Sequence, residues 1–218
     1  MSEKISYTTA DGVVITGIYF AGAVGGKTAI LLHMRPATKE SWQVFAAQLV
    51  SSGFSALAID LRGHGESVQA AGKTLDYHTM TEAEERQSIK DVEGAALWLE
   101  REHGVAPEEL VLIGASIGAN VALQFLADSP SVPAAVLLSP GLDYRGILTE
   151  PLAEKLSDEQ RVMLIAAEDD AEASECVPVL AEKISGPHEL KLFKSGGHGT
   201  KLFESHPDLQ QEIIEWIK

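Results

Sequence analysis

From residue 28 onward, short apolar runs alternate with longer segments in which apolar side chains recur at helical spacing. The runs are continuously apolar, which is typical of strands in a parallel sheet that is covered on both faces. Regular alternation of strand and helix requires right-handed crossovers. It therefore predicts an α/β fold with one mostly parallel central sheet and helices on both faces. The expected strands are residues 28–34, 55–61, 109–115, 134–139, 161–168 and 189–195.

The first twenty residues have a different pattern. Residues 4–9 (KISYTT) and 13–20 (VVITGIYF) have the composition of strands, and Ala10-Asp11-Gly12 separates them. An Asp-Gly pair between two such stretches is a strong hairpin signal. We therefore expect an N-terminal β-hairpin ahead of the parallel sheet.

The helical segments are marked by their spacing and by one capping signal. Thr81 and Glu84 have the three-residue offset of a capping box, which predicts a helix start. The apolar face of that helix contains Val92 and Leu99. Other helices are expected around residues 42–49, 117–127, 172–184 and 209–217.

No internal repeat, low-complexity tract or long linker divides the chain, so we expect a single domain over residues 1–218. The longest connection between late strands runs from Pro140 to about Gln160. It contains Pro151 and could carry one short helix. This leaves room for little or no lid over a ligand site.

The formal net charge is −15, from 17 Lys and Arg residues against 32 Asp and Glu residues. Such a surface repels phosphate backbones and anionic lipids, so we expect neither a nucleic acid nor a membrane as partner. The single Cys176 cannot form an internal disulfide, and the polar start MSEKISYTT lacks the apolar stretch of a signal peptide. These features favour a cytoplasmic protein. They leave open whether the chain forms a homo-oligomer.

The stretch GASIG places Ser116 between Gly114 and Gly118, where an apolar strand ends and a helix begins. Serine is a favoured N-cap residue, so a purely structural role has a physical basis. The same strand–turn–helix setting is that of a nucleophile elbow, in which a strained turn presents the serine hydroxyl. The glycines let strand and helix approach closely, and the free N–H of Ile117 at the helix start can stabilise an oxyanion.

A serine nucleophile needs a base, and the base needs an orienting carboxylate. Downstream of Ser116, the acidic residues Glu168, Asp169 and Asp170 follow one strand, and His198 lies in a glycine-rich loop after the last strand. Acidic residues after a strand are most often solvated or cap the next helix. Ligands of open parallel sheets bind at the C-terminal strand ends, however, and these residues are expected there together.

Five short motifs are spread over nearly the whole chain: LLHMRP (31–36), DLRGHGES (60–67), GASIG (114–118), IAAEDD (165–170) and GGHG (196–199). They resemble the α/β-hydrolase superfamily, particularly its small, lid-poor esterases and dienelactone-hydrolase-like members. The resemblance implies Ser116 as nucleophile, His198 as general base and Asp170 as the triad acid, with Asp169 as the fallback. It also implies that the loop containing His64 is structural rather than catalytic.

The resemblance further implies that the N–H of Arg35 is the second oxyanion donor beside that of Ile117. The superfamily commonly has His-Gly before this position, whereas this chain has His33-Met34-Arg35. The side chain of Arg35 brings a fixed positive charge near the expected cleft. One hypothesis is that it favours substrates with a carboxylate; the alternative is a guanidinium turned to solvent.

The combined pattern predicts a serine hydrolase that cleaves carboxylic esters through a Ser-His-Asp triad and an acyl-enzyme. The expected enzyme is a carboxylesterase acting on a small-molecule ester, and its mechanism requires no metal or organic cofactor. The same triad would serve a thioesterase, a lactone hydrolase or a small peptidase. From a different class, a non-catalytic binding protein with this fold stays open.

Overall fold

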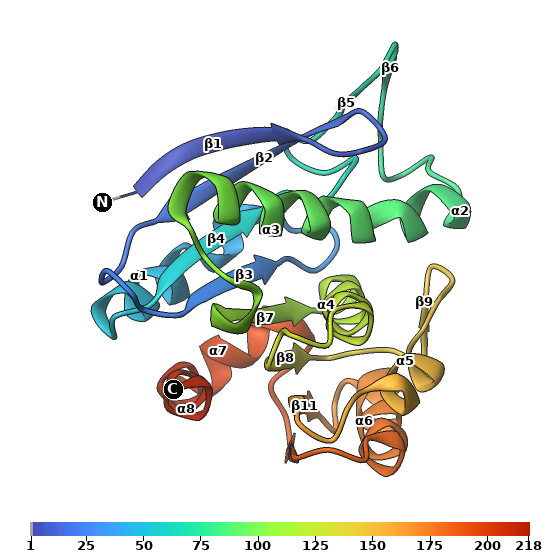
Figure 1. The fold of residues 1–218 in the computed structure, drawn as a ribbon. Helices are drawn as coiled ribbons and strands as arrows, with labels where there is room; N and C mark the ends of the chain where they lie inside the picture. The colour runs from blue at the N-terminus through green and yellow to red at the C-terminus, as the bar shows by residue number, and fades with distance from the viewer. Residues whose placement is uncertain (1) are drawn as a thin grey trace.

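A ten-stranded sheet runs through the computed structural model, which describes residues 2–218 (Figure 1). A separate two-stranded hairpin lies after the sixth long strand. The sheet contains β1 (Ser2–Thr8), β2 (Val13–Phe20), β3 (Thr28–Leu32), β4 (Ser55–Ile59), β5 (Gln69–Ala70), β6 (Lys73–Thr74), β7 (Leu110–Ala115), β8 (Ala134–Leu138), β11 (Arg161–Ala167) and β12 (His188–Phe193), and the hairpin contains β9 (Asp143–Tyr144) and β10 (Ile147–Leu148).

The strand order across the sheet is β12-β11-β8-β7-β3-β4-β2-β5-β6, and β1 pairs with β2. The strands from β12 to β4 are parallel to their neighbours. In contrast, β2 is antiparallel to β4, and β1 is antiparallel to β2. The predicted mostly parallel sheet and the N-terminal hairpin are both confirmed.

Helices cover both faces of this sheet (Figure 1). They are α1 (Gln43–Ser51), α2 (Glu82–Glu85), α3 (Ile89–His103), α4 (Ile117–Asp128), α5 (Thr149–Lys155), α6 (Ala171–Lys183), α7 (Leu202–Ser205) and α8 (Leu209–Ile217), with 3₁₀ helices η1 (Lys39–Trp42), η2 (Arg86–Ser88), η3 (Pro107–Glu109) and η4 (Gly199–Lys201). Helices α3, α4 and α6 pack on one face, and α1 and α8 pack on the other. The central strands are buried along their whole length, which explains their continuous apolar runs.

Three segments differ in detail from the elements that the sequence pattern predicted. The capping box of Thr81 and Glu84 is present, but the helix it begins is divided into α2, η2 and α3. The loop after β4 contains β5 and β6, and β5 pairs with β2. The connection after Pro140 carries the hairpin of β9 and β10 as well as the expected helix, α5. Strands of two residues are too short to produce a readable period in the sequence.

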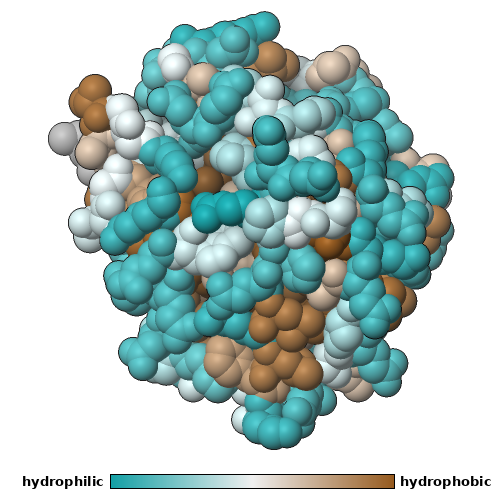
Figure 2. All heavy atoms as spheres, turned by 60° about the horizontal axis from the view of Figure 1, so that its bottom comes forward, coloured by the Kyte–Doolittle hydropathy of each residue, from teal (hydrophilic) through white to brown (hydrophobic). Residues whose placement is uncertain are grey.

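The surface reflects the excess of acidic residues. Figure 2 shows one face of the molecule, on which hydrophilic side chains predominate and apolar side chains gather in smaller patches between them. Among residues 2–218, no helix combines the length and the apolar character needed to cross a bilayer.

Strand β7 and helix α4 meet at two glycines. An ideal Cβ on Gly114 would lie 2.2 Å from the carbonyl oxygen of Gly118. One on Gly118 would lie 2.3 Å from the carbonyl oxygen of Leu32. Both obstacles are backbone atoms that cannot move aside independently, so only glycine fits at either position. The turn between the two glycines holds Ser116.

We predict that Gly118→Ala destabilises the protein by about 3 kcal/mol, because forcing extra atoms into a close contact costs roughly 1–3 kcal/mol and occasionally more. Urea unfolding followed by circular dichroism measures this loss. The control is Gly25→Ala, whose Cβ would meet nothing within 4 Å. That control should lose only about 1 kcal/mol, for the left-handed backbone conformation of Gly25. Equal losses in both variants would contradict the close-approach explanation.

Candidate active site

The C-terminal ends of neighbouring parallel strands carry the predicted catalytic residues to one side of the sheet. Ser116 directly follows β7, Asp170 follows β11, and His198 follows β12. The loop of His198 lies against the turn of Ser116, since an ideal Cβ on Gly199 would be 3.4 Å from the Cβ of Ala115. The fold thus brings the loop of His198 to a turn that lies more than 80 residues earlier in the chain.

Ser116 has a strained backbone at the turn between β7 and α4. Its φ is 55° and its ψ is −123°, a conformation that residues other than glycine rarely adopt. Its carbonyl oxygen accepts hydrogen bonds from the N–H groups of Ala119 and Asn120, so Ser116 does begin the helix. Within residues 2–218, however, its hydroxyl makes no capping hydrogen bond. The helix start and a free hydroxyl therefore coexist in one residue.

His198 and Asp170 form a hydrogen-bonded pair. The Nδ1 of His198 lies 2.8 Å from Oδ2 of Asp170. The histidine side chain is 33% exposed and that of the aspartate 12%, so one side of the ring stays accessible. A carboxylate beside Nδ1 favours the tautomer with its proton on that nitrogen, which leaves Nε2 able to accept a proton.

Asp169, the predicted fallback for the acid, has a different contact. Its carboxylate accepts hydrogen bonds from the backbone N–H groups of Gly196 and Gly197, each at 3.1 Å. These two hydrogen bonds lower the pKa of Asp169. Asp169 therefore shapes the loop that carries His198, whereas Asp170 contacts the imidazole itself.

Ser139 and Tyr144 border the site but were not among the predicted site residues. The hydroxyl of Ser139, which is fully buried, accepts a hydrogen bond from the N–H of Gly199 at 2.9 Å. The ring of Tyr144 lies edge-on to that of His198, with 6.4 Å between ring centroids, and burial raises the pKa of Tyr144. A polar residue directly after a buried strand could have identified Ser139. No sequence signal identified Tyr144, since its position depends on the β9–β10 hairpin.

The two predicted oxyanion donors are Ile117, at the first position of α4, and Arg35, in the loop after β3. Within residues 2–218, no backbone carbonyl accepts a hydrogen bond from either N–H group. The first N–H groups of a helix have no partner inside it, so the N–H of Ile117 is available. The sulfur of Met34 would lie 2.6 Å from an ideal Cβ on Gly199, so Met34 fills the space beside the histidine loop. That these two N–H groups form an oxyanion hole stays a prediction.

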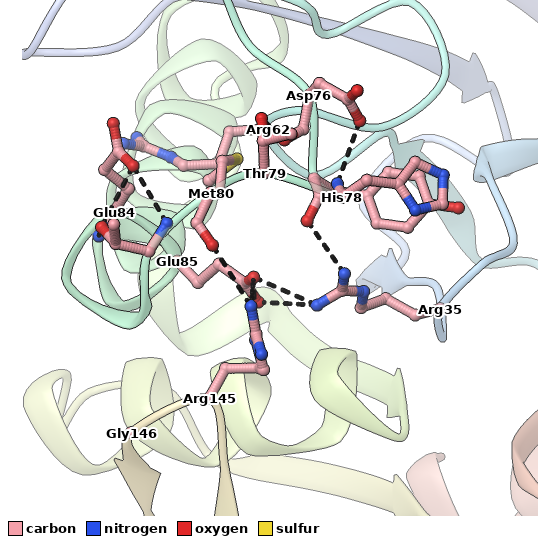
Figure 3. Close-up of polar contacts among 12 residues, drawn as sticks. Arg35, Arg62, Asp76, His78, Thr79, Met80, Glu84, Glu85, Arg145 and Gly146 are labelled. Carbon is pink, nitrogen blue, oxygen red and sulfur yellow. Dashed lines mark hydrogen bonds and ion pairs between the residues drawn. The ribbon is translucent and has the colours of Figure 1, made fainter.

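The guanidinium of Arg35 is neither turned to solvent nor free to bind a substrate. It donates to both carboxylate oxygens of Glu85 at 3.1 Å and to the carbonyl of Tyr77 at 2.9 Å (Figure 3). Glu85 is buried, whereas the side chain of Arg35 is 25% exposed. The hypothesis that Arg35 selects substrate carboxylates is not supported, because its guanidinium donors already point at Glu85 and at the carbonyl of Tyr77.

The DLRGHGES loop is held by its own polar contacts. The carboxylate of Asp60 accepts hydrogen bonds from the backbone N–H groups of Lys39 and Glu66. His64 is buried and its ring stacks on that of Tyr77, with 4.1 Å between centroids. Burial lowers the pKa of His64 to about 3. These contacts agree with the prediction that His64 is structural.

The low pKa of His64 predicts a loss of stability in acid. This side chain titrates near 6.5 in an unfolded chain and near 3 in the folded protein, so the unfolded state binds more protons between these values. The stabilising contribution is complete above pH 6.5 and is lost as the pH falls toward 3, by at most about 1.4 kcal/mol per pH unit. His64→Phe keeps the stacked ring and should flatten the dependence of the urea midpoint on pH between 6 and 4. An unchanged slope would assign the acid sensitivity to other groups.

An apolar hollow lies elsewhere on the described surface. It has a volume of about 370 Å³ and is lined by α3, η3 and α4 residues such as Leu97, Pro107 and Phe125. None of its lining residues is a predicted site residue. The candidate active site is therefore identified by its chemistry and not by the size of a cavity.

A mostly parallel sheet with a serine at a strained strand–helix turn is the architecture of an α/β hydrolase. The family model described as "Serine aminopeptidase, S33" matches residues 27–169, which is more than half of the chain and includes Ser116. The chain therefore belongs to this family of the α/β-hydrolase superfamily, as its motifs predicted.

Two curated relatives have named activities. The thiohydrolase aneE of Aspergillus aculeatus is 21% identical over 208 residues, which cover 94% of this chain and 62% of that protein. Protein phosphatase methylesterase 1 of Bos taurus is 33% identical over 132 residues, which cover 60% of this chain and 31% of that protein. The chain thus spans less than two thirds of the length of either relative.

Solved structures confirm the fold. An esterase from Pyrococcus furiosus has a TM-score of 0.77 at 19% identity, with 100% of this chain and 90% of that chain covered. A dienelactone hydrolase from Anabaena variabilis has a TM-score of 0.73 at 18% identity, with 100% and 94% covered. At these identities the similarity concerns the fold alone.

Proposed function

We propose that the protein is a serine carboxylesterase whose triad is Ser116, His198 and Asp170. The observation that carries the proposal is the His198–Asp170 hydrogen bond of 2.8 Å next to a serine held at a φ of 55°. Backbone strain of this kind costs of order 1–3 kcal/mol and is concentrated at functional sites, where it positions a reacting group. The esterase and methylesterase names among the similar proteins support extending ester cleavage to this chain.

In the acylation half of the proposed reaction, Oγ of Ser116 attacks the carbonyl carbon of the ester. His198 Nε2 takes the hydroxyl proton, and Asp170 stabilises the imidazolium that forms. The N–H groups of Ile117 and Arg35 donate to the oxyanion of the tetrahedral intermediate. When the intermediate collapses, the bond to the leaving alkoxide breaks, and His198 returns the proton to it as the alcohol departs.

In the deacylation half, His198 takes a proton from water, and the hydroxide attacks the acyl-enzyme. The second tetrahedral intermediate collapses with cleavage of the bond to Ser116 Oγ, which regains its proton from His198. The carboxylic acid is then released. This sequence uses side chains, backbone N–H groups and water, so it requires no metal or organic cofactor.

The same chemistry applies to other acyl bonds. The thiohydrolase relative favours a thioester as the second candidate substrate. A lactone or a short peptide would also form an acyl-enzyme on Ser116. Initial rates on matched oxygen esters, thioesters, lactones and aminoacyl amides, compared as kcat/KM, distinguish these classes.

The proposal includes a setting for the enzyme. The substrate is a small-molecule ester, and the protein acts in the cytoplasm without a nucleic-acid or membrane partner. The net charge of −15 supports this part, because it disfavours approach to phosphate-rich surfaces. Sedimentation velocity would decide whether the enzyme acts as a monomer or a homo-oligomer.

Replacing the nucleophile gives the central test. Ser116→Ala should lower kcat on an activated acyl ester by roughly 10⁴-fold or more, because no residual group can form the acyl-enzyme. A fluorophosphonate probe should label the wild-type protein and leave Ser116→Ala unlabelled, as mass spectrometry would detect. Circular dichroism of both proteins controls for folding. Absence of labelling in folded wild-type protein would instead favour the non-catalytic binding protein.

The neighbouring aspartates give a matched pair of variants. Asp170→Asn should lower kcat by roughly 10³- to 10⁴-fold, because it removes the carboxylate that orients the imidazole of His198 and stabilises the imidazolium. Asp169→Asn keeps an oxygen that can accept from Gly196 and Gly197 but loses the charge that strengthens these hydrogen bonds, and it should cost only about tenfold. Steady-state kinetics on one ester measures both. The reverse order of the two losses would identify Asp169 as the triad acid.

A further inference from the structure

Glu85 is a buried carboxylate that holds two arginines from distant parts of the chain (Figure 3). Its side chain is only 5% exposed. Arg35 donates from Nη1 to both of its oxygens at 3.1 Å. Arg145 donates from Nε to Oε1 at 2.8 Å, and its Nη2 lies 2.7 Å from the same oxygen. One carboxylate thus links the loop after β3 to the β9–β10 hairpin.

Each arginine has a second anchor on the segment that leads into Glu85. Arg35 donates to the carbonyl of Tyr77 at 2.9 Å, and its guanidinium carbon lies 4.7 Å from the centroid of the Tyr77 ring. Arg145 donates to the carbonyl of Met80 at 3.2 Å. Each guanidinium group is therefore paired with Glu85 and also held in one orientation by a backbone carbonyl.

The two arginines adjoin the two sides of the candidate active site. Arg35 carries the N–H proposed as an oxyanion donor, and the preceding Met34 fills the space beside the histidine loop. Arg145 directly follows Tyr144, whose ring lies edge-on to His198. Arg145 itself has a φ of 56°, an uncommon conformation that the hairpin turn maintains.

We propose that Glu85 is a positioning residue, and that the cluster of Arg35, Glu85 and Arg145 (the Glu85 clamp) sets the distance between the oxyanion loop and the wall formed by Tyr144. The inference rests on the proposed function and deepens it, since it explains what holds the two sides of the substrate cleft. Glu85 touches no reacting atom and acts only through the two arginines.

The charge of Glu85 explains why the two arginines converge on one point. The two guanidinium groups repel each other, and only their shared attraction to the Glu85 carboxylate outweighs this repulsion. The side chains of Arg35 and Arg145 are already 25% and 40% exposed, so without the charge of Glu85 they would turn further toward solvent and take their loops with them. Displacement of a catalytic donor by about 1 Å can cost roughly 100-fold in rate.

Glu85→Gln keeps the size of the side chain and removes its charge. We expect kcat/KM on an activated acyl ester to fall about 10- to 100-fold. Labelling by the fluorophosphonate probe should slow in the same proportion. Amide hydrogen exchange of residues 143–148 should become faster at pH values where the protein remains folded, since the hairpin has lost its tether.

The control variant is Asp11→Asn. Asp11 is likewise shared between two cations, Arg62 at 2.8 Å and Lys90 at 3.5 Å, but it lies in the turn between β1 and β2. This variant should lose thermal stability while its kcat, KM and exchange at residues 143–148 match those of the wild type. It separates loss of a shared ion pair from loss of positioning.

Single-arm variants distinguish the two roles of the clamp. Arg145→Met releases only the hairpin and should mainly raise KM for esters with bulky acyl groups, because Tyr144 is no longer held as a wall. Arg35→Met releases only the oxyanion loop and should mainly lower kcat. Arg145→Lys keeps the charge and should recover part of the wild-type KM.

The outcomes are separable. Wild-type kinetics and wild-type exchange at residues 143–148 in Glu85→Gln, with only a lower Tm, would overturn the clamp. If Glu85→Gln fails to fold, the single-arm variants decide in the same way: unchanged KM, kcat and exchange in both would overturn it. If the wild-type protein does not react with the probe, the proposed function fails, and hydrogen exchange still tests the clamp by itself.

Discussion

The close contact of α4 with β7 and β3 is the constraint on which the candidate site depends. Gly114 and Gly118 allow backbone to meet backbone, and a Cβ on either would collide with a carbonyl oxygen. The chain between them has room for only one tight turn, which forces the φ of Ser116 to 55°. The energy stored in that turn is offset by the burial of β7 and α4 in the core. The strained conformation of the serine is thus a consequence of how a strand and a helix pack.

Polar contacts also hold the loops around this turn. Asp169 binds two N–H groups of the histidine loop, and Ser139 binds a third. Glu85 joins the loop after β3 to the β9–β10 hairpin through two arginines (Figure 3). Each contact connects elements that leave the same end of the sheet. In the proposed enzyme, a rigid core therefore supports the nucleophile, and a set of directed hydrogen bonds supports its partners.

Much of the fold could be predicted because strands that are buried on both faces of the sheet have continuous apolar sequences. Fully buried strands such as β3 and β8 read as continuous apolar runs, and the Asp11-Gly12 pair marked the first hairpin. The two-residue strands β5, β6, β9 and β10 have no recognisable sequence pattern. Their pairing depends on loop geometry and on contacts with distant segments. For the same reason Tyr144 and Glu85 could not be recognised from the pattern around them.

The sequence by itself determined the strand and helix order, the glycines around Ser116, and the chain order of serine, acid and histidine at strand ends. These follow from local periodicity and from residue size, which act over a few neighbouring positions. Only the tertiary structure decided that Asp170 and not Asp169 reaches His198, and that the charge of Arg35 is bound by Glu85. Adjacent carboxylates have the same chemistry and nearly the same sequence spacing. Their roles differ because hydrogen bonds between loops far apart in the chain fix which way each side chain points.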